Sequence, residues 1–362
     1  MATLKNIFSN LVSSAPTGVV GIDIGSSSIK VVELQEKKGV LTLSTYGELQ
    51  LGPYVDKGVG ESVTLTAQQE QQALVDIVRE SAVSVRNAVF AMPLSSSFVT
   101  NVTINTEPES DMSAMVRVEA RKVIPASLSE VTLDWAEVGG EAKEKRKRGQ
   151  KYPHKILIAA IQNVALERFK VLMKFAELEE PPTEIECFSA ARALFDSAEQ
   201  HLAIVDIGAS SAKLYIAQNG LLMRMHRTRA GGSLVTEKIA AELDCSFEEA
   251  ELKKQTIDRN ASDFAKIQKL NHGVYDRAFR EFRQVIGEYE KNNGVSIDIV
   301  QLSGGAALFP GTERHLKDSL NKEVFMSNPF KKVSYPAFMH DTMKEIGPSF
   351  TVALGAALRA FE

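Results

Sequence analysis

One short pattern occurs twice in this chain, about half a chain apart. The first copy spans residues 21–32 and reads GIDIGSSSIKVV, and the second spans residues 204–215 and reads IVDIGASSAKLY. From the Asp to the Lys, six of the eight positions are identical. In each copy an apolar run ends in Asp, a bend of small residues follows, and a Lys leads into a second apolar run. This pattern predicts a β-hairpin with small residues at its tip.

Such a tip has a specific chemical use. Glycine lets the backbone approach a ligand closely, and successive N–H groups at the bend form a concavity that fits an anion. Asp23 and Asp206 end the first strands of the two hairpins, and they can hold a hydrated divalent cation beside that anion, because hard cations prefer oxygen ligands. Two tips that face each other would hold a polyphosphate from both sides.

Two further glycine sites support this interpretation. Gly231 and Gly232 come directly before a predicted helix, where free N–H groups and the helix dipole favour phosphate. Ser303, Gly304 and Gly305 follow a predicted strand, and the missing side chains leave room for a flat base. Each site alone is a weak signal, whereas the order of hairpin, hairpin, Gly-Gly-helix and Ser-Gly-Gly is a strong one.

The composition limits other functions. A formal net charge of -4 gives no electrostatic reason to expect nucleic-acid binding. The six histidines show no paired metal-ligand spacing, so a zinc site is not expected. No apolar run approaches the roughly 20 residues that a membrane-spanning helix needs. Two cysteines, Cys187 and Cys245, favour a reducing compartment over a disulfide framework.

Two segments of the sequence are each consistent with two interpretations. Apolar residues between Leu4 and Val12 fall on one face of a helix, which either docks on the protein's own body or contacts a partner or a membrane surface. The basic run at 143–148 is either a solvated loop or a contact for anionic lipid or a partner.

The periodicity of the chain indicates an internal duplication in an α/β fold. Each half begins with three predicted strands, and residues 93–180 read as a module inserted into the first half. Thr66 to Gln69 has the form of a capping box and opens a predicted helix. Residues 183–187 read as a strand with a helix from Phe188, and the region 236–292 reads as helical.

Taken together, these motifs resemble those of the actin-like ATPase superfamily, and the resemblance extends from about Gly18 to Ala360. It implies a duplicated, ribonuclease-H-like fold of two domains with an inserted subdomain of the FtsA type. The phosphate motifs would be 23–28 and 206–211, the adenosine motif 303–308, and the two connecting helices 186–194 and 352–359. The implied subdomains are 1A at 18–92 and 181–200, 1C at 93–180, 2A at 201–235 and 296–362, and 2B at 236–295.

Within that superfamily the chain is most similar to the FtsA and PilM families. The pattern Gly231-Gly232-x-x-x-Thr236-x-x-Ile239-Ala240 and the later Ala250-Glu251-x-Lys253 resemble a pattern that the two families share. The chain ends at Glu362, just after its last predicted core helix, whereas the FtsA family carries a C-terminal tail with a membrane-binding helix. PilM is therefore the expected family.

A PilM resemblance implies a cytoplasmic, ATP-binding assembly protein of the type IV pilus platform. It also implies a peripheral position at the inner membrane, through the N-terminal cytoplasmic tail of a PilN-like membrane protein bound in a groove of the first domain. Other pilus platform or motor proteins, or a second copy of the chain, are further expected partners. The alternatives are an FtsA-like filament protein of cell division and, less favoured, a metabolite kinase of the same superfamily.

The resemblance also assigns roles to individual residues, with ATP and Mg²⁺ as ligands. Asp23 and Asp206 would orient Mg²⁺ through water, and Lys30 would reach a phosphate. The backbone of both tips would hold the phosphates, and four glycines would frame the adenosine with a lysine near the ribose. These further positions are Gly25, Ser26, Ser27, Ser28, Gly208, Ala209, Ser210, Ser211, Gly231, Gly232, Gly304, Gly305, and Lys238 or Lys253.

Whether such a site hydrolyses ATP is left open by the sequence. Glu186 occupies the place of a residue that orients the attacking water, and the alternative is an exposed strand end. Lys213 is either part of the site or a strand residue that faces solvent. Cys187 and Ala209 depart from the superfamily pattern, which puts fast turnover in doubt. ATP would then act as a structural or switching ligand, with slow or no hydrolysis.

Overall fold

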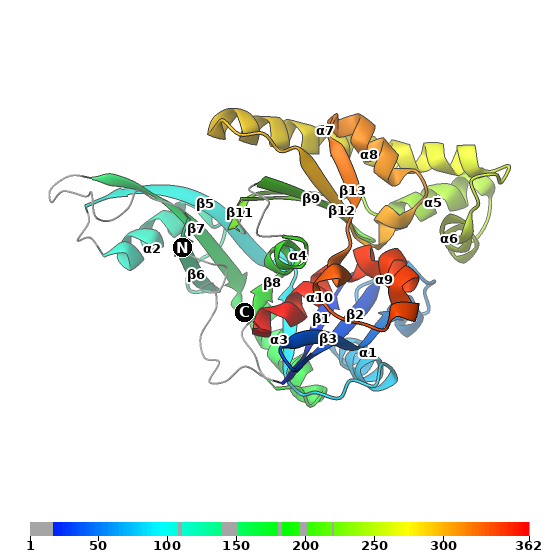
Figure 1. Cartoon of the computed structure of the whole chain (residues 1–362), viewed down its shortest axis with the longest axis horizontal. Coiled ribbons are helices and arrows are strands. Elements are labelled where there is room, and N and C mark those ends of the chain that lie inside the picture. Colours follow the sequence, from blue (N-terminus) through cyan, green and yellow to red (C-terminus); the bar gives the residue numbers. More distant parts are fainter. Residues whose placement is uncertain are drawn as a thin grey trace.

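The protein contains two five-stranded sheets of the same topology (Figure 1). The computed structural model describes residues 17–107, 111–138, 151–179, 183–195, 201–218 and 221–361. The amphipathic N-terminal segment and the basic run at 143–148 lie outside these residues. Within the described residues, no helix combines the length and the apolar character that crossing a membrane requires.

The first sheet has the order β3-β2-β1-β4-β8. Its first three strands pair antiparallel, and β1, β4 and β8 pair in parallel. Its strands are β1 (Gly18–Ile24), β2 (Ser28–Lys37), β3 (Val40–Gln50), β4 (Ala88–Met92) and β8 (Glu184–Ile185).

The second sheet repeats this order as β11-β10-β9-β12-β13, with antiparallel pairing among the first three strands and parallel pairing among the last three. Its strands are β9 (His201–Ile207), β10 (Ala212–Gln218), β11 (Leu221–Thr228), β12 (Ile299–Ser303) and β13 (Glu323–Met326). The predicted duplication is confirmed, since both halves build one sheet in one strand order.

Two helices lie between the sheets, at the centre of Figure 1. They are α4 (Glu186–Leu194) and α10 (Thr351–Leu358). Gly355 allows their close contact, because a Cβ atom there would lie 1.8 Å from the carbonyl oxygen of Ser189. Glu184 accepts hydrogen bonds from Arg192 and Arg359, and these cations hold the pKa of its carboxyl below the ordinary value although burial alone would raise it. The ion cluster ties both helices to the first sheet.

The inserted module is a three-stranded sheet of order β5-β7-β6, with one helix against it. Its elements are β5 (Ser97–Thr106), α2 (Met112–Val123), β6 (Val131–Glu137) and β7 (Tyr152–Gln162). The next helix, α3 (Asn163–Phe175), packs against the first sheet instead, where the ring of Phe169 meets that of Phe90 at 5.3 Å between centroids. The subdomain boundaries remain a prediction. Helix α3 belongs to the predicted subdomain 1C in sequence, but its contacts with the first sheet cross the boundary of that subdomain.

Of the remaining helices, one packs on the first sheet, four pack together in the second half, and the last packs near α10. Thr66 caps the helix over the first sheet through a complete capping box with Gln69, as predicted. The predicted helical region of the second half divides into three helices. These elements are α1 (Ala67–Glu80), α5 (Gly232–Leu243), α6 (Phe247–Thr256), α7 (Phe264–Asn293), α8 (Thr312–Leu320) and α9 (His340–Ile346).

Candidate functional site

The two predicted hairpins have the same local structure. In the β1–β2 hairpin the N–H of Gly25 donates to the carbonyl of Ser28 at 2.9 Å, and in the β9–β10 hairpin the N–H of Gly208 donates to the carbonyl of Ser211 at 2.9 Å. In each hairpin the Asp at the end of the first strand lies opposite the Lys of the second strand. The sequence repeat is therefore also a repeat of backbone geometry.

Both hairpin tips line one cleft between the two halves, with a volume of about 160 Å³. Ten of the predicted site residues meet there. They are Asp23, Gly25, Ser26, Lys30, Glu186, Asp206, Ser210, Ser211, Gly304 and Gly305. Ser303, Pro348 and Thr351 complete the wall beside Gly304, where the N–H of Gly304 and the hydroxyl of Ser303 both donate to the carbonyl of Pro348.

Other predicted residues do not line this cleft. Ser27, Ser28, Gly208, Ala209, Gly231 and Gly232 belong to this group. The N–H groups of Gly232 and Ser233, at the start of α5, donate to the carbonyls of Gly208 and Ala209 at 3.0 and 2.9 Å. The free donors expected there for phosphate are thus bound to the second hairpin, and the Gly-Gly turn supports the tip from behind.

The two lysines proposed near a ribose also lie away from the cleft. Lys238 is exposed, and Lys253 pairs with Asp263 at 3.4 Å on the surface. The lysine that faces the Gly-Gly turn is Lys254, whose Nζ donates to the carbonyl of Gly232 at 3.2 Å. A signal for Lys254 was present in the sequence, because it lies four residues after the buried Ala250 on the same helix face.

The cleft concentrates carboxylates in a small volume. Burial raises the pKa of Asp23 to about 6, with Glu186 and Asp206 raising it further and Lys30 and Lys213 opposing them. Burial also raises the pKa of Asp206, and Lys213 limits that rise. Lys30 pairs with Glu48 at 3.0 Å and donates to Ser28 Oγ at 2.6 Å.

Lys213 is the cation at the centre of this cluster. Its Nζ lies 2.6 Å from Glu186 Oε2 and 3.4 Å from Asp206 Oδ2. Burial alone would lower the pKa of Lys213, but the neighbouring carboxylates raise it well above its ordinary value. Of the two interpretations of Lys213 that the sequence left open, the one in which it is a strand residue facing solvent is wrong.

Glu186 is held on both sides. It begins α4, and its Oε1 accepts from the backbone N–H of Leu94 at 2.8 Å while Oε2 accepts from Lys213. Its side chain is 8% exposed, so the interpretation as an exposed strand end is wrong. The strand predicted at 183–187 ends at Ile185, because the backbone turns into the helix there.

One cleft residue carried no signal in the sequence. Arg227 lies on β11 opposite Lys213 and lines the cleft. Its place there depends on the pairing of β10 with β11 rather than on any local motif.

No group of three or more His, Cys, Asp or Glu side chains is placed to hold a metal ion in the part of the chain that the structure describes. Asp23 and Asp206 offer two oxygen donors at the cleft.

A model of the family described as type IV pilus assembly protein PilM matches residues 21–361, which include both hairpins and the whole cleft. The chain belongs to the PilM family. Its fold is similar to that of a chain in the solved PilM–PilN type IV pilus biogenesis complex, with a TM-score of 0.79 and 23% identity over 96% of this chain and 100% of that chain.

Two other solved structures share the fold of this PilM family member more distantly. The ethanolamine utilization protein EutJ from Carboxydothermus hydrogenoformans matches with a TM-score of 0.57 and 17% identity, over 95% of this chain and 90% of that chain. MreB 5 of Spiroplasma citri bound to AMPPNP matches with a TM-score of 0.51 and 11% identity, over 94% of this chain and 95% of that chain. These likenesses establish an actin-like architecture.

Proposed function

We propose that this PilM family member binds ATP with Mg²⁺ in the cleft between its two hairpins and uses the bound nucleotide to set the arrangement of its two halves. The observation that carries the proposal is that two hairpin tips of the same geometry line a single cleft. A nucleotide triphosphate suits such a site because its anionic end can be contacted from both halves at once. The solved MreB 5 structure, which shares the fold, holds the ATP analogue AMPPNP.

The residues at the cleft fit such a ligand. Ser26 on one tip, and Ser210 and Ser211 on the other, offer backbone and hydroxyl donors, while Lys30 and Arg227 supply positive charge. Asp23 and Asp206 would hold Mg²⁺ through its water ligands, and the cation would neutralise part of the phosphate charge. Gly304 would let a base lie close to the backbone, since it has no side chain and a φ of +92°.

The arrangement favours slow or absent hydrolysis. A residue that orients an attacking water must turn an acceptor lone pair toward it. In this structure each carboxylate oxygen of Glu186 already accepts one hydrogen bond, from the N–H of Leu94 and from Lys213, which leaves one lone pair on each oxygen and fixes the direction of the carboxylate. We therefore infer that Glu186 serves chiefly to position Lys213, and that the nucleotide acts as a switching ligand rather than as a substrate of rapid turnover.

Nucleotide entry would require the two halves to separate. The cleft volume of about 160 Å³ is below the range of about 300–1,000 Å³ that holds a drug-sized ligand. The contacts that join the halves include the pair of Lys213 with Glu186 at the cleft and, outside it, the hydrogen bond from the Ser233 hydroxyl to the carbonyl of Gly60 at 2.8 Å. A ligand that binds the more open arrangement better would shift the population toward it.

We further propose that the output of this switch is a protein interaction at the pilus platform. The family membership supports a role in pilus assembly, and the solved PilM–PilN complex supports a PilN-like membrane protein as the partner. The N-terminal cytoplasmic tail of that protein would bind the first half of the chain. The protein would then act in the cytoplasm, held at the inner membrane through this partner.

Calorimetry tests the nucleotide site directly. Asp23→Ala should abolish ATP binding in the presence of Mg²⁺, while the variant keeps the fold, because Asp23 lines the cleft. Normal ATP binding by this variant would mean that the site is assigned wrongly.

Two further measurements separate the alternatives. A synthetic peptide with the PilN-like tail sequence should bind the wild-type protein with an affinity that changes when ATP is added. Phosphate release should stay slow with and without a panel of sugars. ATP-dependent filaments in sedimentation would instead favour an FtsA-like role, and sugar-dependent ADP release would favour a kinase.

A further inference from the structure

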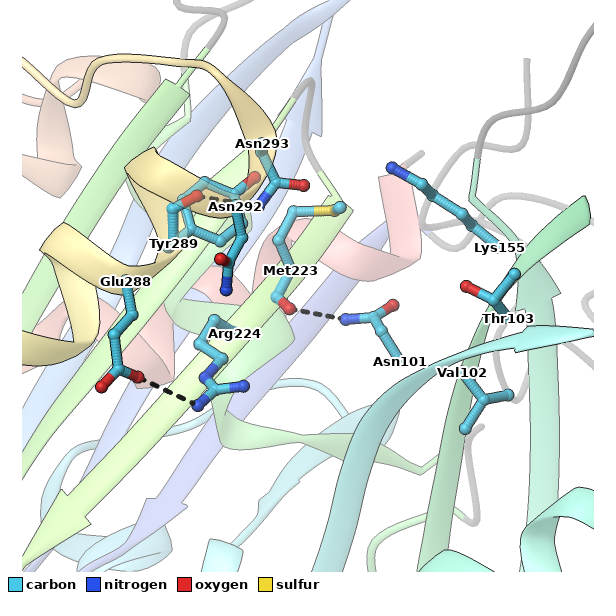
Figure 2. Close-up of a pocket in the computed structure, with 10 residues that line it drawn as sticks. All are labelled: Asn101, Val102, Thr103, Lys155, Met223, Arg224, Glu288, Tyr289, Asn292 and Asn293. Atoms are coloured by element: carbon cyan, nitrogen blue, oxygen red, sulfur yellow. Dashed lines mark hydrogen bonds and ion pairs between the residues drawn. The ribbon is translucent and has the colours of Figure 1, made fainter.

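A second cavity lies between the inserted module and the second half (Figure 2). Its volume is about 200 Å³, and it shares no lining residue with the cleft between the hairpins. One wall comes from β5 and β7 of the module. The other comes from β11 and the C-terminal turn of α7, so the cavity is formed by parts of the chain that are far apart in sequence.

Two sheet edges meet at this cavity. Among the described strands, β5 ends the three-stranded sheet and β11 ends the second large sheet. An edge strand presents unpaired backbone N–H and C=O groups, which extended peptides commonly use for binding. A shift of register between β10 and β11 leaves Met223 without an opposite residue, and the carbonyls of Leu222 and Met223 turn toward the module.

Asn101 on β5 bridges the two edges. Its Nδ2 donates to the carbonyl of Met223 at 2.7 Å and to that of Leu222 at 3.2 Å. These two acceptors fix the orientation of the amide, because only the NH₂ group can donate to them. The Oδ1 atom is thereby left buried without a hydrogen-bond partner among the described residues. A buried acceptor of this kind costs free energy unless a donor reaches it.

Other polar groups point into the same space. In Figure 2 the Thr103 hydroxyl points toward the amide oxygen of Asn101, and the Lys155 side chain extends into the gap above them, on the side of Asn293. In the part of the chain that the structure describes, no ion pair involves Lys155. The other charges at the cavity are those of Arg224 and Glu288, which lie 4.0 Å apart and largely balance each other. The unbalanced charge is thus positive.

We propose that this cavity binds an extended segment of a partner protein that carries a carboxylate side chain. The carboxylate would pair with Lys155, and a backbone N–H of the segment would reach the buried Oδ1 of Asn101 once the edges of β5 and β11 move slightly apart. The small volume favours a chain that passes through over an enclosed small molecule, since pockets for drug-sized ligands hold about 300–1,000 Å³. The proposal depends neither on the nucleotide nor on the PilN-like tail.

Such a segment would contact the inserted module and the second half together. Asn101 is the described hydrogen-bonded link between β5 and β11, and the two strands belong to different sheets. A bound chain would add contacts to both walls of the cavity. Occupancy of the cavity would therefore restrict motion of the module relative to the second half.

Fluorescence anisotropy with two labelled peptides tests the proposal. One peptide alternates valine and glutamate, and the other alternates valine and lysine, so that both are extended and differ only in charge. At low ionic strength the wild-type protein should bind the glutamate peptide about tenfold more tightly than the lysine peptide. Lys155→Glu should lose this preference or reverse it.

A matched charge change at a second lysine distinguishes a specific contact with Lys155 from a general effect of the protein's net charge. Lys174→Glu alters an exposed lysine on α3 that does not line the cavity, and it should leave the preference unchanged. Asn101→Ala should weaken glutamate-peptide binding about tenfold, with a thermal melt to confirm that the variant is folded. The proposal fails if wild type does not bind the glutamate peptide or binds both peptides equally, or if Lys155→Glu and Lys174→Glu behave alike.

Discussion

Lys213 Nζ lies 2.6 Å from Glu186 Oε2, and this ion pair joins β10 of the second half to the first turn of α4 at the first half. Both side chains are largely removed from solvent, with exposures of 14% and 8%. Asp206 lies within 3.4 Å of the same ammonium. The lysine therefore offsets two carboxylates at the point where the two halves meet.

Removal of this lysine should destabilise the protein strongly. Lys213→Met leaves Glu186 and Asp206 without their nearest cation, and breaking a buried pair from one side costs about 3–5 kcal/mol. Urea denaturation measures the loss. Arg314→Ala is the control, because the Arg314–Asp318 pair is exposed to solvent and should contribute little to stability. Equal losses in the two variants would show that Lys213 has no special structural role.

Asp23 should make stability depend on pH in a defined window. Its pKa is about 6 in the folded protein, against 3.8 for an unperturbed aspartate side chain, so the folded state holds this proton more tightly. The stabilisation is complete below about pH 4 and is lost as the pH rises through about 6. Above pH 6 the ionised, buried carboxylate lowers the free energy of unfolding by at most about 3 kcal/mol.

The variant Asp23→Asn isolates this contribution. Without nucleotide and Mg²⁺, it should be about 1–3 kcal/mol more stable than wild type at pH 7.5, and the difference should shrink toward zero as the pH falls to about 4. Thermal unfolding of both proteins across this range gives the comparison. A difference that stays constant with pH would contradict the raised pKa of Asp23.

The local elements were predictable from the sequence because short-range patterns determine them. The paired hairpins and the capping box at Thr66 are specified by residues within a few positions of each other. The helix start at Glu186 is implied by the family resemblance instead, since the local pattern predicts a strand over 183–187. The surroundings of Lys213 and Arg227 are set by strand pairing and by closure of the halves. No local pattern reports these long-range contacts.

The same limit explains the Gly231–Gly232 turn. The sequence correctly placed it before a helix, where free N–H groups are expected. It gave no sign that the second hairpin tip lies against that helix start and accepts its first two donors. A motif predicts which groups are available locally, whereas the tertiary fold decides which partner they meet.

One substitution, Gly to Ala, should have opposite effects at two helical positions. In α10, Gly355→Ala would place a Cβ atom 1.8 Å from the carbonyl oxygen of Ser189 and force α4 and α10 apart, at a cost of about 2–4 kcal/mol. In α7, Gly287→Ala meets nothing within 4 Å and should stabilise by about 0.5–1 kcal/mol through helix propensity. Chemical denaturation of both variants checks the signs, and a mild effect at Gly355 would contradict the close helix contact.

Arg227 should contribute to nucleotide binding without contributing to the fold. It lines the cleft from β11, it is exposed, and no ion pair to it is found among the described residues, so its charge remains available for an anion. Arg227→Ala should weaken ATP binding about tenfold in calorimetry, the size of one charge-assisted hydrogen bond to phosphate, with an unchanged melting temperature. Arg229→Ala removes another exposed arginine two residues along, which does not line the cleft, and should leave the affinity unchanged. If the two variants bind ATP alike, the positive side of the cleft is made by Lys30 and Lys213 alone.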